Sequence, residues 1–431
     1  MKDKIYIKAC KSLVGDFFIP GDKSISHRSV MFAALGDKAV TITNFLNSQD
    51  CLSTVKCMQA LGIDIEIINA NEIIVHGKGI HGLSEAQDVL DAGNSGTTLR
   101  LMMGILSAQP FFSTFTGDQS LRKRPMRRVI DPLREMGANL VSRNDSKYLP
   151  LAVIPVNQLK AIQYDMPMAS AQVKSAILLA GMYTDGETIV TEPYTSRDHT
   201  ERMLETFGVE LRKFGTSIGI KKVGNLVSPD RMNIPGDISS AAFWLVAASV
   251  IPNSEITIRN VGVNPTRTGI LDVLKAMGAD IQLINQRWSG KEPVADLIVK
   301  SAHLKGVSFG AEIMPRLIDE IPIITVAAMF AEGETVISGA GELRVKETDR
   351  LSAITTEFAK MGADIRGTED GLIIKGNAPL KSAECYSYHD HRIAMALAIA
   401  GIAAQGVEIQ VPDCVDISYP DFYAVLDDLR K

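Results

Sequence analysis

The chain has 431 residues, of which 46% are hydrophobic and 22% are charged. A chain of this length exceeds one ordinary hydrophobic core, so two or more domains are expected. Its formal net charge of −5 argues against a general nucleic-acid-binding protein, because such proteins are usually basic.

Several features of the chain argue against membrane insertion and secretion. No apolar run approaches the roughly 20 residues that cross a bilayer. Residues 1–7 enter an alternating, strand-like pattern, unlike a secretory signal or a transit peptide. The five cysteines form no Cys-x-x-Cys pair and no Cys/His cluster. We therefore expect a reduced, cytoplasmic location.

One pattern recurs five times along the chain: a helix-like run, a bulky apolar residue, a glycine and a short alternating strand. Successive copies lie about 70 to 84 residues apart, and their glycines are Gly62, Gly137, Gly208, Gly278 and Gly362. Each glycine stands where a helix ends, because glycine tolerates positive φ there. Common helix capping is the alternative, but five copies at similar spacing favour an internal repeat.

The repeat predicts an α/β protein whose units each contain two helices and several short strands. Five copies and a remnant suggest six units, the sixth completed by the two chain ends, and hence two domains of three units. Pro-Gly pairs at 20–21 and 235–236 interrupt regular structure. Crossings between the domains at these pairs give one domain of residues 21–234 and another of residues 1–20 plus 235–431.

Apolar periodicity predicts six principal helices. The three in the second half are almost entirely apolar and should be buried on most sides. The predicted helices are Ser26–Leu35, Thr97–Ser107, Ala171–Ala180, Ile238–Ser249, Ile323–Phe330 and Ile393–Ala403.

The first chemical motif is Gly21-Asp-Lys-Ser-Ile-Ser-His-Arg28, which lies between an apolar strand and a helix. We expect Lys23 and Ser24 just before the helix, where free backbone N–H groups favour an anion, and Arg28 one turn inside it. The glycine pattern of a P-loop is missing. Taken alone, the segment fits an anion site and a capping serine with solvated charges equally well.

Two further segments of the first half suit anions. The glycine-rich loop Asp91–Arg100 opens onto a helix and contains Asn94 and Gly96. Its glycines would let a ligand approach the backbone, although one such loop is a weak signal. The segment 117–128 holds five cations within seven residues, Arg124 among them. A solvated basic surface is the alternative interpretation of that cluster.

Polar residues also stand at later helix starts. Ser170 and Gln172 open an apolar helix, a position suited to hydroxyl or carbonyl recognition, and Arg197 lies beside another helix start. In the second half, Asp319 precedes a strongly apolar helix. Lys346 and Arg350, four residues apart, are expected to share one helical face. His391 and Arg392 are expected at a helix N-terminus.

Two other kinds of site have less support. His389, Asp390 and His391 offer metal ligands, but their spacing matches no structural zinc pattern and no cysteine lies near them in sequence. A Ser/His/Asp triad is possible from the inventory, but no Gly-x-Ser-x-Gly elbow supports it.

The cations come from both halves of the chain and would repel one another without a ligand of several negative charges. We therefore expect a cleft between two domains that closes on polyanionic small molecules. Arginine binds phosphate and carboxylate through paired hydrogen bonds. The set comprises Lys23, Arg28, Arg124, Arg197, Lys346, Arg350 and Arg392.

Five motifs, in order, resemble the enolpyruvyl transferase family, and within it the branch that acts on shikimate 3-phosphate. They are Pro-Gly-Asp-Lys-Ser-Ile-Ser-His-Arg at 20–28, Gly-Asn-Ser-Gly-Thr at 93–97, Gly-Asp-x-Ser-Leu-x-x-Arg-Pro-Met at 117–126, Arg-Val-Lys-Glu-Thr-Asp-Arg at 344–350 and Asp-His-Arg at 390–392. The resemblance implies two domains of three βαβαββ units each, joined by a two-strand hinge, with the active site in the cleft. That agrees with the repeat.

The resemblance also implies roles for individual residues. It assigns acid–base catalysis to Asp319, Glu347 and Lys23. The residues implied for shikimate 3-phosphate are Lys23, Ser24, Arg28, Ser170, Ala171, Gln172, Arg197, Asp319 and Lys346. The residues implied for phosphoenolpyruvate are Lys23, Asn94, Gly96, Arg124, Gln172, Arg350, His391 and Arg392.

The implied reaction adds the 5-hydroxyl of shikimate 3-phosphate to phosphoenolpyruvate and then eliminates phosphate. It needs no metal and no organic cofactor, and the resemblance implies a monomer. Glycine at position 96 predicts inhibition by glyphosate in competition with phosphoenolpyruvate. Some members carry a lysine where this chain has Ile417, so one contact to phosphoenolpyruvate is absent or supplied by another group.

Two rival functions share parts of this pattern. The related transferase that acts on UDP-N-acetylglucosamine typically carries a loop cysteine, whereas this chain has no cysteine between positions 58 and 384. A non-catalytic module that binds phosphorylated metabolites would share the cationic cleft, but it would not need Asp319 and Glu347.

Overall fold

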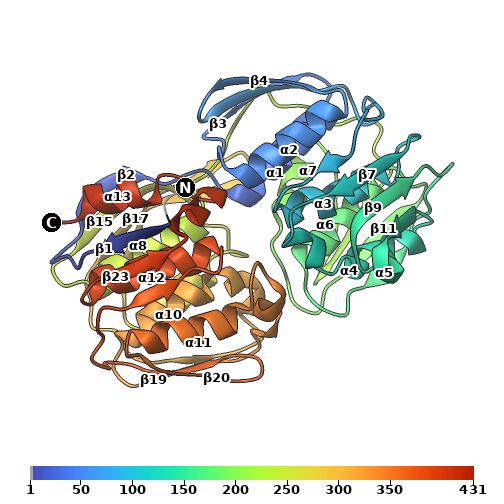
Figure 1. Cartoon of the computed structure of the whole chain (residues 1–431). Helices are drawn as coiled ribbons and strands as arrows, with labels where there is room; N and C mark the ends of the chain where they lie inside the picture. Colours follow the sequence, from blue (N-terminus) through green and yellow to red (C-terminus); the bar gives the residue numbers. More distant parts are fainter. Residues whose placement is uncertain (1–2) are drawn as a thin grey trace. The chain divides into compact units, whose positions relative to one another are not determined.

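The structure is a computed structural model that describes residues 3–431, and these divide into two compact units (Figure 1). The N-terminal unit comprises Gly21–Ile234 and Ser289–Glu292. The C-terminal unit comprises Pro235–Trp288, Pro293–Lys431 and the described residues up to Pro20. The chain therefore changes unit at the two Pro-Gly pairs. It changes unit again on each side of Ser289–Glu292, which form a short hairpin tip.

The N-terminal unit contains three four-stranded sheets, each with its helices. Its helices are α1 (Lys23–Leu35), α2 (Gln49–Ala60), α3 (Gly96–Leu106), η1 (Leu121–Lys123), α4 (Arg127–Glu135), α5 (Arg143–Ser146), α6 (Ala171–Gly181) and α7 (His199–Thr206). Its strands are β3 (Ala39–Thr43), β4 (Asp64–Asn69), β5 (Glu72–His76), β6 (Leu90–Asp91), β7 (Ser113–Thr116), β8 (Asn139–Ser142), β9 (Tyr148–Ile154), β10 (Gln163–Asp165), β11 (Glu187–Thr191), β12 (Arg212–Phe214), β13 (Ser217–Lys221) and β14 (Arg231–Asn233).

The C-terminal unit contains two four-stranded sheets and one three-stranded sheet. Its helices are α8 (Ile238–Val250), α9 (Gly269–Ala276), η2 (Met314–Arg316), η3 (Ile318–Glu320), α10 (Ile321–Met329), η4 (Gly341–Val345), α11 (Arg350–Lys360), α12 (His391–Ala403), η5 (Pro412–Ile417) and α13 (Phe422–Leu429). Its strands are β1 (Lys4–Ile7), β2 (Val14–Phe18), β15 (Glu255–Gly262), β16 (Asp280–Ser289), β17 (Glu292–Lys300), β18 (Ser308–Phe309), β19 (Glu334–Ile337), β20 (Asp364–Gly367), β21 (Leu372–Lys375), β22 (Glu384–Tyr386) and β23 (Val407–Gln410).

The sheets repeat one strand order. Orders such as β6-β7-β9-β8 and β18-β19-β21-β20 begin with a parallel pair and continue with antiparallel neighbours. In the three-stranded sheet, β1 from the start of the chain pairs antiparallel with β23 from its end. This confirms an α/β fold of six small mixed sheets, one of which is completed by both chain ends.

The five repeat glycines lie where the sequence predicts them. Gly62, Gly137, Gly208, Gly278 and Gly362 follow the ends of α2, α4, α7, α9 and α11, and their φ angles are 86°, 93°, 80°, 93° and 91°. In this left-handed region any side chain with a Cβ would be strained, so glycine ends each helix and turns the chain toward the next strand. In the third copy that strand begins only at Arg212, a few residues later than predicted.

The core of each unit lies between its helices and the inner faces of its sheets. The predicted burial of the three apolar helices is confirmed, because nearly every residue of α8, α10 and α12 is buried. In Figure 1, β19 and β20 form an outer layer over α10 and α11, and β3 and β4 lie over α1 and α2. In the N-terminal unit α3 and α6 pack closely, since a Cβ at Gly104 would lie 2.3 Å from the carbonyl oxygen of Ala176.

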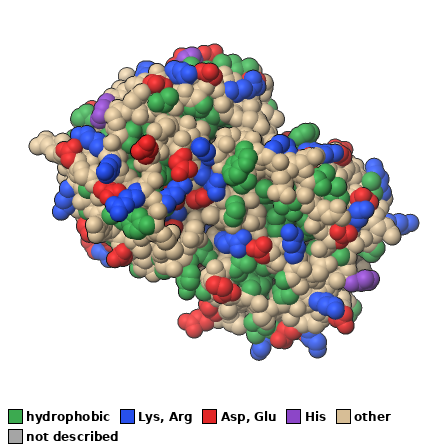
Figure 2. Space-filling model, turned by 180° about the vertical axis from the view of Figure 1, so that it is seen from behind, with side chains coloured by type: hydrophobic (Ala, Val, Ile, Leu, Met, Phe, Trp, Pro, Cys, Tyr) green, Lys and Arg blue, Asp and Glu red, His purple; other side chains and the backbone are tan. Residues whose placement is uncertain are grey.

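Two general findings agree with the composition. Within the described part of the chain, no helix combines the length and the hydropathy of a membrane span. On the face shown in Figure 2, Lys and Arg side chains are interspersed with Asp and Glu.

Candidate active site

The first motif forms the start of α1, which begins at Lys23 rather than at the predicted Ser26. Lys23 and Ser24 therefore lie inside the first turn, and the prediction that they precede the helix is wrong. The helix begins earlier because the Asp22 side chain accepts a hydrogen bond from the Ile25 N–H at 2.9 Å. A capping aspartate satisfies one of the free N–H groups at a helix start.

The Arg28 guanidinium is buried and donates hydrogen bonds to acceptors on three helices. Its Nε donates to Thr200 Oγ1 at 2.7 Å, and its two Nη atoms donate to Ser24 O at 2.9 Å and Ser175 Oγ at 3.0 Å. These acceptors come from α1, α6 and α7, which are distant in sequence. Tertiary packing therefore fixes the direction of this cation.

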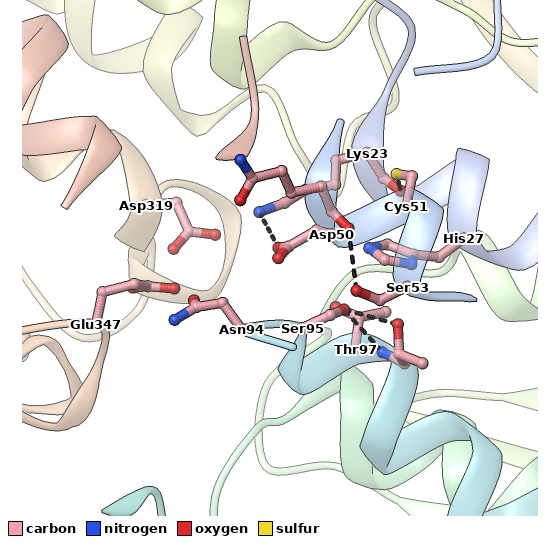
Figure 3. A network of polar contacts seen from close by, with 12 residues as sticks. Lys23, His27, Asp50, Cys51, Ser53, Asn94, Ser95, Thr97, Asp319 and Glu347 are labelled. Carbon is pink, nitrogen blue, oxygen red and sulfur yellow. Dashed lines mark hydrogen bonds and ion pairs between the residues drawn. The ribbon is translucent and has the colours of Figure 1, made fainter. Parts of the chain in front are cut away.

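Lys23 points toward a carboxylate that the sequence prediction missed. Its Nζ lies 3.1 Å from Asp50 Oδ2, a buried residue in the first turn of α2, as Figure 3 shows. One turn further along α1, His27 is fully buried, and its Nδ1 lies 2.6 Å from Thr54 Oγ1. Burial, with the nearby charges of Lys23 and Arg28, holds the pKa of His27 well below its usual value, so His27 is neutral near pH 7.

The glycine-rich loop opens α3 as predicted. Ser95 caps the helix by accepting the Thr98 N–H at 3.1 Å. Asn94 joins the loop to the basic segment, because its Oδ1 accepts from Arg124 Nη2 at 3.0 Å and its Nδ2 donates to Asp118 Oδ2 at 2.6 Å. The structure thus brings Asn94 and Arg124 together, 30 residues apart in sequence.

Gln172 connects α6 to α3. Its Oε1 accepts from Arg100 Nη1 at 2.7 Å, and its Nε2 donates to Thr97 Oγ1 at 3.1 Å. A Cβ at Gly96 would lie only 2.5 Å from Arg100 Nη1 and 3.6 Å from Arg124 Nη1. A side chain at position 96 would therefore collide with the Arg100 guanidinium, and glycine lets that group approach the backbone closely. Arg100 ended the predicted loop motif, but its role in holding Gln172 was not foreseen.

The remaining predicted residues of this unit lie at helix starts. Ser170 is the N-cap residue of α6 and Ala171 is its first residue. Arg197 is partly exposed and lies two residues before α7. These positions agree with the sequence prediction.

In the C-terminal unit, Arg350 lies at the centre of three carboxylates. Its guanidinium lies 2.8 Å from Asp390, 2.7 Å from Glu347 and 3.4 Å from Asp319. The Arg350 side chain is only 1% exposed. Burial opposes its charge, yet the carboxylates of Asp390, Glu347 and Asp319 outweigh burial and raise the pKa of Arg350. The two predicted catalytic carboxylates therefore contact one buried cation.

The start of α12 places a second cation, Arg392, beside the segment that contains Asp319 and Glu320. Asp390 caps α12 by accepting the Arg392 N–H at 2.9 Å. The Arg392 guanidinium donates to the Asp319 carbonyl oxygen at 3.0 Å and lies 3.6 Å from Glu320 Oε1. His391 is buried in the first turn of α12. The prediction of a helix start at this pair is confirmed.

Lys346 and Arg350 do not share a helical face, so that prediction is wrong. Lys346 follows η4 in a non-helical conformation, and α11 begins only at Arg350. The helix starts there because Asp349 caps it by accepting the Ser352 N–H at 3.1 Å. Lys346 Nζ instead lies 3.3 Å from Glu342 Oε1.

The described residues include one group of potential metal ligands and five free cysteines. His389 and His391 belong to no group of three close potential ligands, and the one such group among residues 3–431 is Asp64, Glu66 and His76, of which the two acids are exposed. All five cysteines are free. Burial raises the pKa of the Cys57 thiol to about 12, which disfavours a reactive thiolate.

Comparison with known proteins identifies the family. The family model described as EPSP synthase (3-phosphoshikimate 1-carboxyvinyltransferase) matches residues 7–426. The chain belongs to the EPSP synthase family. The 3-phosphoshikimate 1-carboxyvinyltransferase of Desulforamulus reducens is 51% identical over 427 residues, which cover 99% of both chains. That of Bacillus thuringiensis is 51% identical over 432 residues and covers both chains completely.

Solved structures agree. EPSP synthase from Acinetobacter baumannii superimposes with a TM-score of 0.89 at 44% identity and covers 100% of this chain and 98% of its own. The enolpyruvyl transferase NikO from Streptomyces tendae matches with a TM-score of 0.79 at 17% identity over 99% and 97% of the two chains, which shows a shared fold only. The family membership gives this chain EPSP synthase activity, in the shikimate route to aromatic amino acids.

Proposed function

We propose that the activity proceeds by addition and elimination at a site built from the residues described above. The 5-hydroxyl of shikimate 3-phosphate attacks C2 of phosphoenolpyruvate while C3 gains a proton. The resulting tetrahedral ketal then loses phosphate from C2 and a proton from C3. The observation that carries this proposal is that Asp319 and Glu347 both contact the same buried guanidinium, that of Arg350.

Arg350 supports acid–base chemistry in two ways. Its positive charge lies beside both carboxylates, and an ionised carboxylate can accept a proton. Its hydrogen bonds also fix where the two groups point, and positioned acid–base groups typically contribute about 10² to 10⁴ in rate. We assign Asp319 as the base for the 5-hydroxyl, and Glu347 with Lys23 to proton transfer at C3.

The cations of the N-terminal unit suit the two anionic substrates. The residues of this unit assigned to shikimate 3-phosphate are Lys23, Ser24, Arg28, Ser170, Ala171, Gln172 and Arg197, and those of the C-terminal unit are Asp319 and Lys346. Phosphoenolpyruvate is assigned to Asn94, Gly96, Arg124, Gln172 and Lys23, together with Arg350, His391 and Arg392. At Gly96 the guanidinium groups of Arg100 and Arg124 lie close to the backbone, and two neighbouring guanidinium groups support a small anion there.

The two compact units correspond, in this proposal, to two domains of three βαβαββ repeats joined by a two-strand hinge. We propose that the substrates bring the cations of both domains together in the cleft between them, since like charges need an anion to approach one another. Closure then excludes water and orients the reactants, which is the main requirement of this reaction. A cytoplasmic monomer that needs no metal or organic cofactor stays our prediction.

The test is the release of inorganic phosphate from phosphoenolpyruvate. We expect one phosphate per enolpyruvyl group transferred when shikimate 3-phosphate is the acceptor, and none when UDP-N-acetylglucosamine replaces it. Phosphate release with the nucleotide sugar, or none with shikimate 3-phosphate, would contradict the proposal.

A further inference from the structure

Lys174 forms a buried charge cluster that the reaction described above does not use. It is the fourth residue of α6, and its side chain is 1% exposed. Its Nζ lies 2.7 Å from Glu192 Oε2 and 2.7 Å from Glu201 Oε1, and both carboxylates are also buried. Removing three charged groups from water costs free energy, and in some proteins such clusters specify one arrangement of their surroundings.

The Glu192 side of the cluster shapes the loop that leads to Arg197. Glu192 follows β11, and its carboxylate accepts hydrogen bonds from both the side chain and the backbone N–H of Ser196, the latter at 3.2 Å. The chain between residues 192 and 196 is thereby folded back on itself. Arg197 is the next residue, so the charge of Lys174 holds the end of the loop from which Arg197 extends.

The Glu201 side of the cluster leads to Arg28. Lys174 and Ser175 are neighbours on α6, and Thr200 and Glu201 are neighbours on α7. Lys174 contacts Glu201, and Ser175 Oγ lies 2.6 Å from Thr200 Oγ1. These two hydroxyls are the acceptors of Arg28 Nη2 and Nε. Two adjacent cross-links therefore join α6 to α7, and the second of them holds Arg28.

We infer that Lys174 is a positioning residue that sets the relative placement of Arg28 and Arg197 for the phosphate group of a phosphorylated cyclic alcohol. The inference rests on the proposed assignment of these two arginines to shikimate 3-phosphate. Lys174 acts through Glu192 and Glu201 and does not touch the substrate. Loss of its charge leaves two buried carboxylates without their cation and frees both α7 and the loop before it.

The K174M variant tests this inference because methionine keeps most of the volume and removes the charge. Calorimetry with shikimate 3-phosphate alone should show binding weakened about tenfold, equal to about 1.4 kcal/mol. The KM for phosphoenolpyruvate should change less than about threefold, since Arg124 and Gly96 lie outside the cluster. Amide hydrogen exchange over residues 192–198 should rise, while exchange over α3 should not.

Two further variants keep the test decisive if K174M does not fold. In E201Q the Lys174–Glu192 pair is intact and the side-chain shape is preserved, and Glu201 Oε2 has no hydrogen-bond partner among the described residues. We expect E201Q to fold and to bind shikimate 3-phosphate about threefold more weakly. K174R should restore part of the affinity that K174M loses.

The matched control is D296N in the C-terminal unit. Asp296 is a buried acid that contacts Arg259 and Arg287. D296N should lower the melting temperature without changing the affinity for shikimate 3-phosphate. Wild-type affinity for shikimate 3-phosphate in folded K174M or E201Q would overturn the positioning role, whatever hydrogen exchange shows. A loss of affinity in D296N as large as that in K174M and E201Q would also overturn it.

R197M separates this inference from the proposed function. Wild-type affinity for shikimate 3-phosphate in R197M would overturn the assignment of Arg197 to that substrate. The hydrogen exchange of residues 192–198 in K174M reports on the loop itself and does not depend on which ligand Arg197 holds. Unchanged exchange there would overturn the positioning role even if R197M behaved as proposed.

Discussion

Predicted binding arginines of the two units have different acceptors, although Lys23 of the N-terminal unit also pairs with a carboxylate, that of Asp50. In the N-terminal unit, Arg28 donates to two hydroxyls and a carbonyl, and Arg124 donates to an amide and a hydroxyl. In the C-terminal unit, Arg350 contacts three carboxylates. A neutral acceptor orients a cation without sharing its charge, whereas a carboxylate shares that charge and can exchange protons. The first arrangement suits anion binding and the second suits acid–base chemistry.

The largest expected effect comes from neutralising the carboxylates around Arg350. D319N and E347Q should each lower kcat by about 10² to 10⁴ while sparing substrate binding, because shape and hydrogen bonding are kept and the proton-transfer groups are lost. Steady-state kinetics and calorimetry measure the two quantities. E312Q, a change at an acid outside the site, is the control, and wild-type turnover in either site variant would break the comparison.

Removal of the arginines themselves should separate stability from binding. R350M leaves buried carboxylates without their cation and should destabilise the C-terminal unit by about 3–5 kcal/mol. R124M should instead raise the KM for phosphoenolpyruvate about 10- to 100-fold and lower the melting temperature less than R350M does, because Arg124 donates hydrogen bonds to the uncharged side chains of Asn94 and Ser120. Calorimetric melting and steady-state kinetics of both variants check this, and equal losses of stability would contradict it.

Position 96 should control the response to glyphosate. We expect glyphosate to inhibit the wild-type enzyme in competition with phosphoenolpyruvate. Full activity at about 1 mM glyphosate would refute this, because any Kd for glyphosate would then lie far above that concentration. In G96A the new methyl group meets Arg100 Nη1 at 2.5 Å, so the inhibition constant should rise at least about tenfold, with a smaller rise in the KM for phosphoenolpyruvate. G224A is the control, since a Cβ there meets nothing within 4 Å.

The smallest effect concerns pH and the N-terminal unit alone. Because the pKa of His27 is lowered in the folded state, the unfolded chain binds a proton that the folded chain does not, and stability is lost as pH falls below the usual histidine pKa of about 6.5. The loss should approach about 1.4 kcal/mol per pH unit and be weaker in H27N. Denaturant melts between pH 7 and 5 measure it. The exposed His303→Asn control should keep the wild-type slope.

The sequence by itself determined the repeat, the positions of the anion-binding motifs and most helix starts. The five glycines after helices are local signals, because one residue with positive φ ends a helix whatever packs on it. The segments around Arg28, Gly96 and Arg392 are also local, since a helix start and its cap lie within a few residues. The resemblance added substrate roles that no local rule supplies.

Only the tertiary structure decided which groups hold those residues. Asp50, Thr200 and Ser175 lie 27, 172 and 147 residues from their partners Lys23 and Arg28, and no periodicity links them. The helical face predicted for Lys346 and Arg350 failed because Asp349 caps the helix between them. In the sequence Lys174 is one lysine in an apolar helix. The packing of α6, α7 and β11 brings the carboxylates of Glu192 and Glu201 to it. Hydrogen bonds of this kind depend on distances across a folded core, which the order of residues along the chain does not encode locally.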